Sequence, residues 1–433
     1  MPLKFVFGPS GSGKSTYLYQ HVIEESEKYP LKNFIVLVPE QFTMQTQKDL
    51  VSMHPRHGIM NIDVLSFARL AYRVFEETGT KQMQVLDDEG KNLILRKIAG
   101  DYENKLTVLK GNIKKLGYIS EVKSVISEFT QYDIGEEEMD EMLDHLDEDS
   151  RLYYKLKDIR LLYEGFQDYL RERYITKEEL LDVLNSQVKE SELLKNSVVV
   201  LDGFTGFTPV QNRLILELMR CCKEVWVTVT MDERENPYAY KHPYQLFGLS
   251  KQMVTTLVRM AGEDHIEVEE PVCLYGYPVK RFEKNQELAF LERNIFRYGA
   301  GRYDKAVENL EIHAAGNPRQ EADAVAEGIR RLVRKEQYRY RDIGVIVSDM
   351  NVYGDYLEQA FENYGIPVFM DHKRSILLNS FVEYIRSLLN MAEKNFSYES
   401  VFRFLRTNLA GFACEEVDEL ENYVLGLGIR GYK

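Results

Sequence analysis

The chain has 433 residues, of which 44% are hydrophobic and 29% are charged, and its formal net charge is −14 at pH 7. This length and apolar content predict a globular protein of two or three domains. The negative balance argues against a sequence-wide electrostatic attraction to nucleic acid, although a local groove is compatible with it. Much of the excess lies in 136-EEEMDEMLDHLDED-149, where nine of fourteen residues are acidic, as is typical of a solvated surface.

Simple patterns also exclude membrane and disulfide-rich classes of protein. No run of 18 consecutive apolar residues is present, and the N-terminus lacks the pattern of a secretory signal, so we expect no membrane contact and a cytoplasmic location. The spacing of the four cysteines matches neither a zinc site nor a disulfide framework. We therefore expect reduced thiols at Cys221, Cys222, Cys273 and Cys414.

The first elements along the chain predict a phosphate-binding unit of α/β type. Buried strands are expected at 3–7 and 34–38, and an amphipathic helix at 14–28 lies between them. The segment 8-GPSGSGKS-15 connects the first strand to the helix and fits the pattern G-x-x-x-x-G-K-[ST]. A strand before this motif and a helix after it are the context that phosphate binding requires.

Each residue type in this loop has a role in holding a nucleoside triphosphate. The glycines let backbone N–H groups point at phosphate oxygens beside the positive end of the following helix. Lys14 would contact the β- and γ-phosphates of ATP, and the Ser15 hydroxyl would bind Mg²⁺. The alternative is a vestigial loop that is retained for the fold. The predicted nucleotide-binding residues of the loop are Gly8, Pro9, Ser10, Gly11, Ser12, Gly13, Lys14, Ser15 and Thr16.

The middle of the chain predicts a helical domain inserted into the first α/β domain. A third strand is expected at 61–67, after which strand signals are absent from about 85 to 195. Apolar residues there recur at three- and four-residue spacing, as in 90–100, 113–129 and 153–170. Strands are then expected again at 197–201 and 224–230.

The remainder of the chain predicts a second α/β domain. Its strands are expected at 309–315, 343–348 and 366–370, with a long helix at 319–336, and the segment after 377 is again helical. The predicted organisation is a first domain at 1–84 and 196–305, a helical insertion at 85–195, an incomplete second domain at 306–380 and the start of another helical insertion at 381–433.

The residue that follows Asp202, at the end of the strand expected at 197–201, bears on whether ATP is hydrolysed. A working phosphate-loop enzyme needs an Asp that binds Mg²⁺ and a neighbouring carboxylate that positions the attacking water. In 197-SVVVLDGFTG-206, Asp202 ends the strand and is the predicted second Mg²⁺ residue, but Gly203 follows it and has no side chain. Loss of such a base typically costs a factor of about 10² to 10⁴ in rate. We therefore expect ATP binding with little or no hydrolysis.

Five segments carry a family resemblance. They are 7-FGPSGSGKS-15, 36-VLVPEQFTMQTQ-47, 63-DVLSFARLAYRVF-75, 199-VVLDGFTGFTPVQ-211 and 310-LEIHAAGNPRQEADAVAEGIRRLV-333. Together they resemble the N-terminal part of the AddB family, the B subunits of bacterial AddAB helicase-nucleases. The resemblance implies a superfamily one helicase fold, in which RecA-like parallel sheets of α/β type carry large all-helical insertions.

The resemblance also implies a function in the repair of DNA double-strand breaks. Family members form a heterodimer with an AddA-type helicase-nuclease subunit, which is the motor, while AddB scans single-stranded DNA for the hotspot sequence Chi as double-stranded DNA is unwound. Full-length members continue into a nuclease domain with an iron-sulfur cluster held by four cysteines. The cysteines of this chain do not match those positions, so we expect the cluster and the nuclease activity only in a full-length protein.

Polar and aromatic residues after the strands are the candidates for DNA contact. In superfamily one helicases the segments after the second and third strands face the single strand, and aromatic rings there can stack on bases. The predicted DNA-binding residues are Gln41, Thr43, Phe67, Arg69, Tyr72, Phe204 and Phe207. The competing interpretation is that the aromatic residues belong to the core and that Arg69 lies on a solvated face.

Arg319 is a further candidate for the nucleotide site, because helicases often place a γ-phosphate-sensing arginine after a strand of the second domain. Its alternative is an ordinary surface charge at a helix start. Two other functions stay open for the chain as a whole: an autonomous ATP-driven DNA translocase, and a nucleotide-dependent scaffold without DNA contact. The absent side chain at Gly203 argues against the first, and the aromatic strand-end loops argue against the second.

Overall fold

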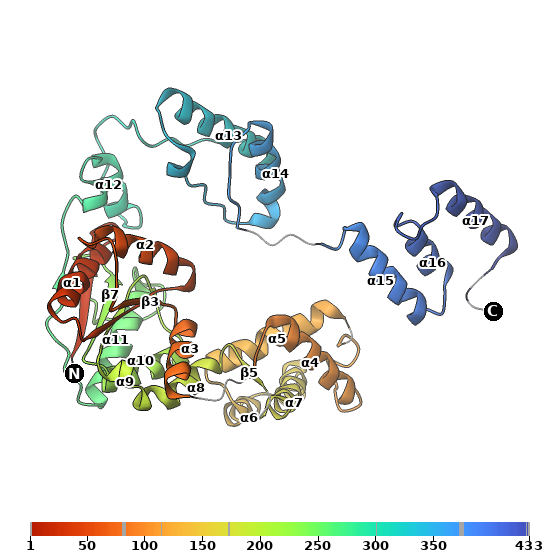
Figure 1. Ribbon diagram of the computed structural model, residues 1–433, viewed down its shortest axis with the longest axis horizontal. Helices are drawn as coiled ribbons and strands as arrows, with labels where there is room; N and C mark the ends of the chain where they lie inside the picture. The colour runs from red at the N-terminus through yellow and green to blue at the C-terminus, as the bar shows by residue number, and fades with distance from the viewer. Residues whose placement is uncertain are drawn as a thin grey trace. The chain divides into compact units, whose positions relative to one another are not determined.

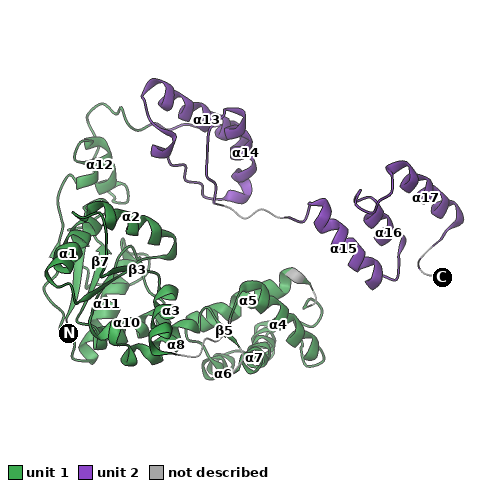
Figure 2. Ribbon diagram, viewed as in Figure 1, with its two compact units in different colours: residues 1–310 green, residues 311–433 purple. Residues whose placement is uncertain are grey.

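The computed structural model describes residues 2–79, 84–113, 115–171, 174–299, 301–371, 376–429 and 431. The chain divides into two compact units, residues 1–310 and 311–433 (Figure 2). Among the described residues, no helix combines the length and the apolar character that crossing a bilayer requires.

Unit 1 is built on a six-stranded parallel sheet with the order β3-β2-β6-β7-β1-β8. Figure 1 shows this sheet among the helices of the unit, with β3 and β7 labelled. Its strands are β1 (Leu3–Gly8), β2 (Asn33–Leu37), β3 (Ile62–Leu65), β6 (Ser197–Leu201), β7 (Glu224–Thr230) and β8 (Val272–Cys273). Because all the pairs are parallel, the carboxyl ends of these strands meet at one edge of the sheet, where open α/β sheets bind their ligands. The predicted α/β class with a parallel sheet is confirmed.

Helices cover both faces of this sheet, which explains why its strands are apolar on both sides. The covering helices are α1 (Lys14–Lys28), α2 (Thr43–Met53), α3 (Phe67–Thr78), α8 (Leu180–Gln187), α9 (Glu192–Lys195), α10 (Pro209–Cys221) and α11 (Gly248–Glu263). Side chains alternate between the faces: Phe5 and Phe7 belong to one core and Val6 to the other. Leu18 of α1 packs in the core that contains Val6, whereas Leu70 of α3 packs in the core that contains Phe5.

A helical part with its own core interrupts the sheet in sequence. It contains α4 (Asp88–Asp101), α5 (Leu116–Gln131), α6 (Glu136–Asp144) and α7 (Arg151–Leu170). The short strands β4 (Gln84–Leu86) and β5 (Tyr174–Thr176) pair in parallel where the chain enters and leaves it. Since β6 then pairs with β2, residues on either side of the helical part share one sheet. The predicted helical insertion is therefore present.

Unit 2 contains α13 (Pro318–Lys335), α14 (Met350–Asn363), α15 (Ser380–Glu393), α16 (Tyr398–Leu405) and α17 (Cys414–Leu427). Helices α13 and α14 pack through Ala322, Ala326, Leu357 and Phe361 beside an apolar cavity of about 730 Å³. In the described part of this unit no segment is a strand, which corrects the strand predictions at 309–315, 343–348 and 366–370. A strand needs a neighbour that exchanges backbone hydrogen bonds with it, and these segments have none among the described residues.

Candidate functional site

The loop 8-GPSGSGKS-15, which we call the phosphate loop, lies at the carboxyl edge of the sheet and connects β1 to α1. Gly11 and Gly13 have φ angles of 85° and 95°, in the left-handed region that favours glycine. A Cβ atom on Gly11 would also lie 2.7 Å from the Cβ of Arg281. Two of the three loop glycines are therefore required by the backbone conformation itself, and Gly11 is required by a close neighbour as well.

Hydrogen-bond donors in this loop fit a phosphate group. Gly13 is the N-cap of α1 and offers no side-chain acceptor, so the first N–H groups of the helix have no side-chain cap. The Oγ atom of Ser12 is buried and has no hydrogen-bond partner among the described residues. Backbone N–H groups at a helix start form a ready site for an anion. The loop therefore offers hydrogen-bond donors that could hold an anionic group such as a phosphate.

Lys14 is turned back onto the loop. Its Nζ donates hydrogen bonds of 2.9 Å to the carbonyl oxygens of Gly8 and Pro9. Burial lowers the pKa of Lys14 to about 8, while the negative charge of Asp202 opposes this shift and the positive charge of Arg281 adds to it. Carbonyl oxygens partly satisfy an ammonium group, and phosphate oxygens would satisfy it better. The ammonium group of Lys14 therefore already lies against the loop, where the motif requires a positive charge.

Asp202 directly follows β6, and β7 alone separates β6 from β1 in the sheet. Its carboxylate is buried and accepts a 2.7 Å hydrogen bond from the Tyr19 hydroxyl and a 2.6 Å hydrogen bond from the Thr228 hydroxyl. Gly203 follows with a φ of 80° and is exposed. Asp202 thus lies near enough to Lys14 to affect its pKa, and its chain neighbour supplies no carboxylate.

A segment that the sequence analysis did not single out crosses the phosphate loop. This segment, 274-LYGYPVKRF-282, begins where the N–H of Leu274 donates to the carbonyl of Phe7 at 2.8 Å. It ends against the loop, where the N–H of Arg281 donates to the carbonyl of Gly11 at 3.1 Å. Lys280 lies close to Gly13, its Cδ 3.5 Å from where a Cβ on that glycine would be. We call residues 274–282 the strap; a basic pair soon after a short strand was the only sequence signal for it.

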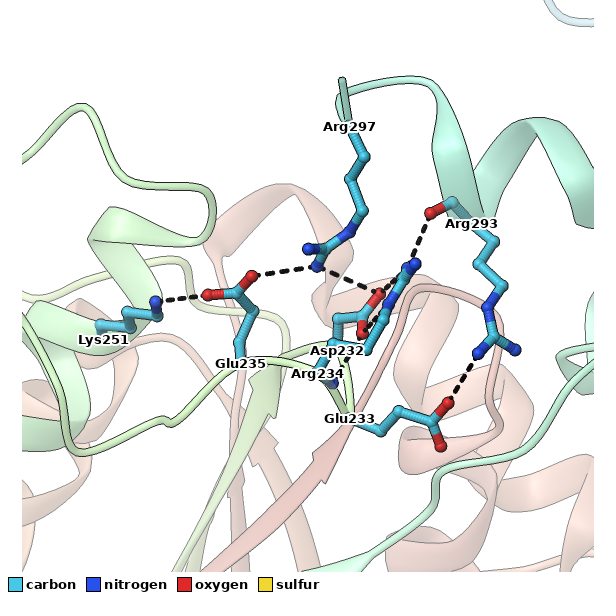
Figure 3. A network of polar contacts seen from close by, with 7 residues as sticks. All are labelled: Asp232, Glu233, Arg234, Glu235, Lys251, Arg293 and Arg297. Atoms are coloured by element: carbon cyan, nitrogen blue, oxygen red, sulfur yellow. Dashed lines mark hydrogen bonds and ion pairs between the residues drawn. The ribbon is translucent and has the colours of Figure 1, made fainter. Parts of the chain in front are cut away.

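The helix that follows the strap is tied to the loop after β7 by ion pairs (Figure 3). Helix α12 (Gln286–Asn294) carries Arg293, which pairs with Glu233 at 2.9 Å. Arg297 lies just beyond the helix and contacts Glu235 at 3.0 Å and Asp232 at 3.5 Å. Hydrogen bonds from Arg234 are the main cause that lowers the pKa of Asp232 to about 2. These contacts fix α12 beside the phosphate loop.

The candidates for DNA contact fall into two groups by exposure. Gln41, Arg69 and Tyr72 are exposed, with Tyr72 at 43%. Thr43 is buried and its hydroxyl donates to the carbonyl of Glu40, so it offers little to a ligand in this conformation. Gln41 precedes α2, and Arg69 and Tyr72 lie on α3, so the exposed candidates follow the carboxyl ends of β2 and β3.

Three aromatic candidates instead form one cluster. The ring of Phe67 lies 5.4 Å from that of Phe204 and 6.4 Å from that of Phe207, and Phe204 and Phe207 are 5.2 Å apart. Phe67 is only 8% exposed, and all three rings pack with the core beneath α3. This cluster joins the loops that follow β3 and β6. Its geometry favours packing for Phe67 and leaves DNA contact at these positions a prediction.

Arg319 belongs to the other unit. It lies in the first turn of α13, one residue after Pro318, and its side chain is exposed. The role of Arg319 at the nucleotide therefore stays a prediction. The four cysteines are free: Cys222 is buried, Cys221 is half-buried, and Cys273 and Cys414 are exposed.

Comparisons with known proteins agree on one family. The sequence model described as "ADDB, N-terminal" matches residues 5–292. A protein of Lachnoclostridium phytofermentans, named as the B subunit of an ATP-dependent helicase/deoxyribonuclease, is 45% identical, and the match covers 100% of this chain and 38% of that protein. Proteins of the same name from Clostridium kluyveri and Caldanaerobacter subterraneus are each 36% identical, over 100% of this chain and 37% of their own length. The chain thus spans well under half the length of these relatives.

Proposed function

The chain belongs to the AddB N-terminal family, and from this membership and the geometry of the phosphate loop we propose that it is the nucleotide-holding, helicase-like part of an AddB-type subunit in an ATP-dependent helicase/deoxyribonuclease. In this role it binds Mg²⁺-ATP and hydrolyses it slowly. The observation that carries the proposal is a loop near Asp202 whose uncapped N–H groups and Ser12 hydroxyl can donate hydrogen bonds to phosphates. The residue after Asp202 is Gly203, at the position where a catalytic carboxylate would stand.

Different residues of the site would bind the phosphates and the metal of Mg²⁺-ATP. The N–H groups at the start of α1, with the Ser12 hydroxyl, would bind phosphate oxygens, and Lys14 would exchange its two carbonyl partners for the β- and γ-phosphates. Ser15 and Asp202 would hold the metal. Mg²⁺, when bound, neutralises phosphate charge and fixes the triphosphate conformation. The residue directly after Asp202 is Gly203, which offers no base for the attacking water. ATP would therefore stay bound and be hydrolysed slowly.

Titration calorimetry with ATP in the presence of Mg²⁺ tests the binding, with Lys14→Ala as the negative control. We expect a measurable dissociation constant for the unaltered chain and none for the variant. Steady-state hydrolysis measured with and without single-stranded DNA tests the second half of the proposal. Equal binding by Lys14→Ala would refute nucleotide holding at this loop, and a DNA-stimulated rate near ~10 s⁻¹, an ordinary enzyme value, would refute slow turnover.

We extend the proposal to the assembly by family membership. The chain would pair with an AddA-type subunit that drives translocation, and its exposed strand-end residues Gln41, Arg69 and Tyr72 would contact single-stranded DNA and contribute to recognition of Chi. Nuclease activity and an iron-sulfur cluster would belong to the portion of the relatives that this chain does not span. Pull-down with the partner and DNA crosslinking through the exposed residues test these assignments.

An ATP-driven motor is the second candidate, and one observation favours it. Glu292 on α12 lies close enough to Lys14 for its charge to raise the pKa of that lysine, and burial raises the pKa of Glu292 itself. A carboxyl with a raised pKa beside a phosphate loop has the properties of a general base. If the chain hydrolyses ATP rapidly and Glu292→Gln abolishes this activity, the motor interpretation replaces nucleotide holding.

A further inference from the structure

Asp202 is held by two hydroxyl groups from two different elements. The Tyr19 hydroxyl binds its Oδ2 atom at 2.7 Å and the Thr228 hydroxyl binds its Oδ1 atom at 2.6 Å. Tyr19 lies on α1 and Thr228 on β7, and each of the three residues is at most 6% exposed. Each carboxylate oxygen therefore has one fixed donor, and the carboxylate plane cannot rotate without breaking a buried hydrogen bond.

The position of Tyr19 connects this cluster to the phosphate loop. Tyr19 follows Ser15 by four residues on α1, so the two side chains lie on the same face of the helix, one turn apart. The helix face that would present Ser15 to the metal therefore also presents the donor that orients Asp202.

We propose that Tyr19 and Thr228 are positioning residues for the metal of the bound nucleotide, because they hold the Asp202 carboxylate in the single orientation that Mg²⁺ meets. The inference rests on the proposed nucleotide function and specifies how the metal of the nucleotide would be held. Residues that hold a metal-binding group by hydrogen bonds typically contribute a factor of about 10 to 100 in metal affinity.

A purely structural role for the two hydroxyls predicts a different result. Buried hydroxyl groups need acceptors whatever their function, so their loss would lower stability and would weaken ATP binding equally with and without metal. A positioning role predicts that only the gain produced by Mg²⁺ decreases. The ratio of the ATP dissociation constants in EDTA and in Mg²⁺ separates these cases, since it is measured within one variant and cancels any general loss of affinity.

The variants are Tyr19→Phe and Thr228→Val, each of which removes one hydroxyl with little change in shape. Thr228→Ser is the conservative variant that keeps the donor. Thr46→Val is the matched control, because it removes a 3.4 Å hydrogen bond between the Thr46 and Tyr19 hydroxyls and leaves both hydrogen bonds to Asp202 in place. Melting temperatures confirm that each variant is folded, and either Tyr19→Phe or Thr228→Val alone is sufficient for the test.

We expect Tyr19→Phe and Thr228→Val to reduce the Mg²⁺-dependent gain in ATP affinity about 10-fold, and Thr228→Ser and Thr46→Val to keep it. If the folded Tyr19→Phe and Thr228→Val variants both retain the full gain, the positioning role is overturned while nucleotide binding stands. If the unaltered chain binds no ATP in either condition, the proposed function fails and this inference fails with it.

Discussion

The backbone N–H of Arg281 donates a hydrogen bond of 3.1 Å to the carbonyl oxygen of Gly11. The side chain of Arg281 also lies so close to Gly11 that a Cβ there would be 2.7 Å from the arginine Cβ. This contact joins the strap to the phosphate loop, and the ion pairs of Arg293 and Arg297 hold the following helix in place. The strap is therefore in direct contact with the backbone of the phosphate loop.

Arg281→Ala should weaken ATP binding. The variant removes a positive charge that lies beside the loop and acts on Lys14, and a hydrogen bond between charged groups contributes about 1.5 to 3 kcal/mol. Calorimetry would then show roughly a 10-fold increase in the dissociation constant, the low end of that range. Arg259→Ala is the matched control, since Arg259 is an exposed arginine of the same unit that pairs with Glu263 on its own helix. Unchanged affinity in Arg281→Ala would show that the strap does not reach the nucleotide.

ATP affinity should decrease as the pH rises above about 8, where Lys14 loses its proton in the free protein. The phosphates bind the charged lysine, so each further pH unit should weaken binding by up to about tenfold. Fluorescence titration with a labelled ATP between pH 7 and 9.5 measures this, and a flat profile would contradict the lowered pKa.

The same shift has the opposite sign for stability without nucleotide. Because the folded pKa of Lys14 lies below its ordinary value of 10.5, the unfolded chain binds more protons between pH 8 and 10.5. The contribution of Lys14 to the free energy of unfolding therefore rises across this window, as the cost of burying its charge is removed. Comparing urea unfolding of the unaltered chain with Lys14→Ala over this range isolates the contribution.

The sequence predicted the parts of the site that are local in the chain. The loop 8-GPSGSGKS-15 and the strand before Asp202 follow rules of motif and alternation, and both were found where they were expected. Tyr19, Thr228 and Arg281 could not be found in this way, because their roles depend on contacts with residues that are far away in sequence. Their side-chain types alone are ordinary for a helix, a strand and a surface turn.

The strands predicted in unit 2 show the limit of pattern alone. The segments near Ile346 and Phe369 have the apolar residues of strands, yet these two side chains are 100% and 89% exposed. Strand propensity reports that a segment fits a packed, hydrogen-bonded surface, and it cannot supply the neighbouring strand. Helix α13 was easier to predict, since its backbone hydrogen bonds are internal.

Replacing Gly203 by Glu should not convert the site into a fast ATPase. Gly203 has a φ of 80°, which is strained for any residue with a side chain and costs about 1 to 3 kcal/mol. The new carboxylate would therefore pull the backbone away from the observed conformation rather than place itself beside the phosphates. We expect a lower melting temperature and a rate that stays far below ~10 s⁻¹; rapid turnover by Gly203→Glu would show that the missing side chain alone limits the chemistry.

The last prediction separates DNA contact from packing among the strand-end residues. Arg69 and Tyr72 are exposed on α3, whereas Phe67 at the start of the same helix is buried against Phe204 and Phe207. In the assembled complex, Arg69→Ala and Tyr72→Ala should each weaken recognition of Chi-containing single strands by about 1 to 3 kcal/mol, the range for base stacking. Phe67→Ala should instead lower the free energy of unfolding by about 3 to 5 kcal/mol, as large buried aromatic truncations do.

The two classes are distinguished by measuring Chi-dependent pausing, unwinding rate and melting temperature in the same variants. For Arg69→Ala and Tyr72→Ala we expect pausing to decrease while unwinding by the AddA-type partner and thermal stability stay nearly unchanged, because both side chains are exposed. Tyr154→Ala, which removes an exposed tyrosine of α7 in the helical part, is the control for surface truncation. If pausing and unwinding decrease together, these residues support the interface with the motor subunit, and the proposal that they contact DNA is contradicted.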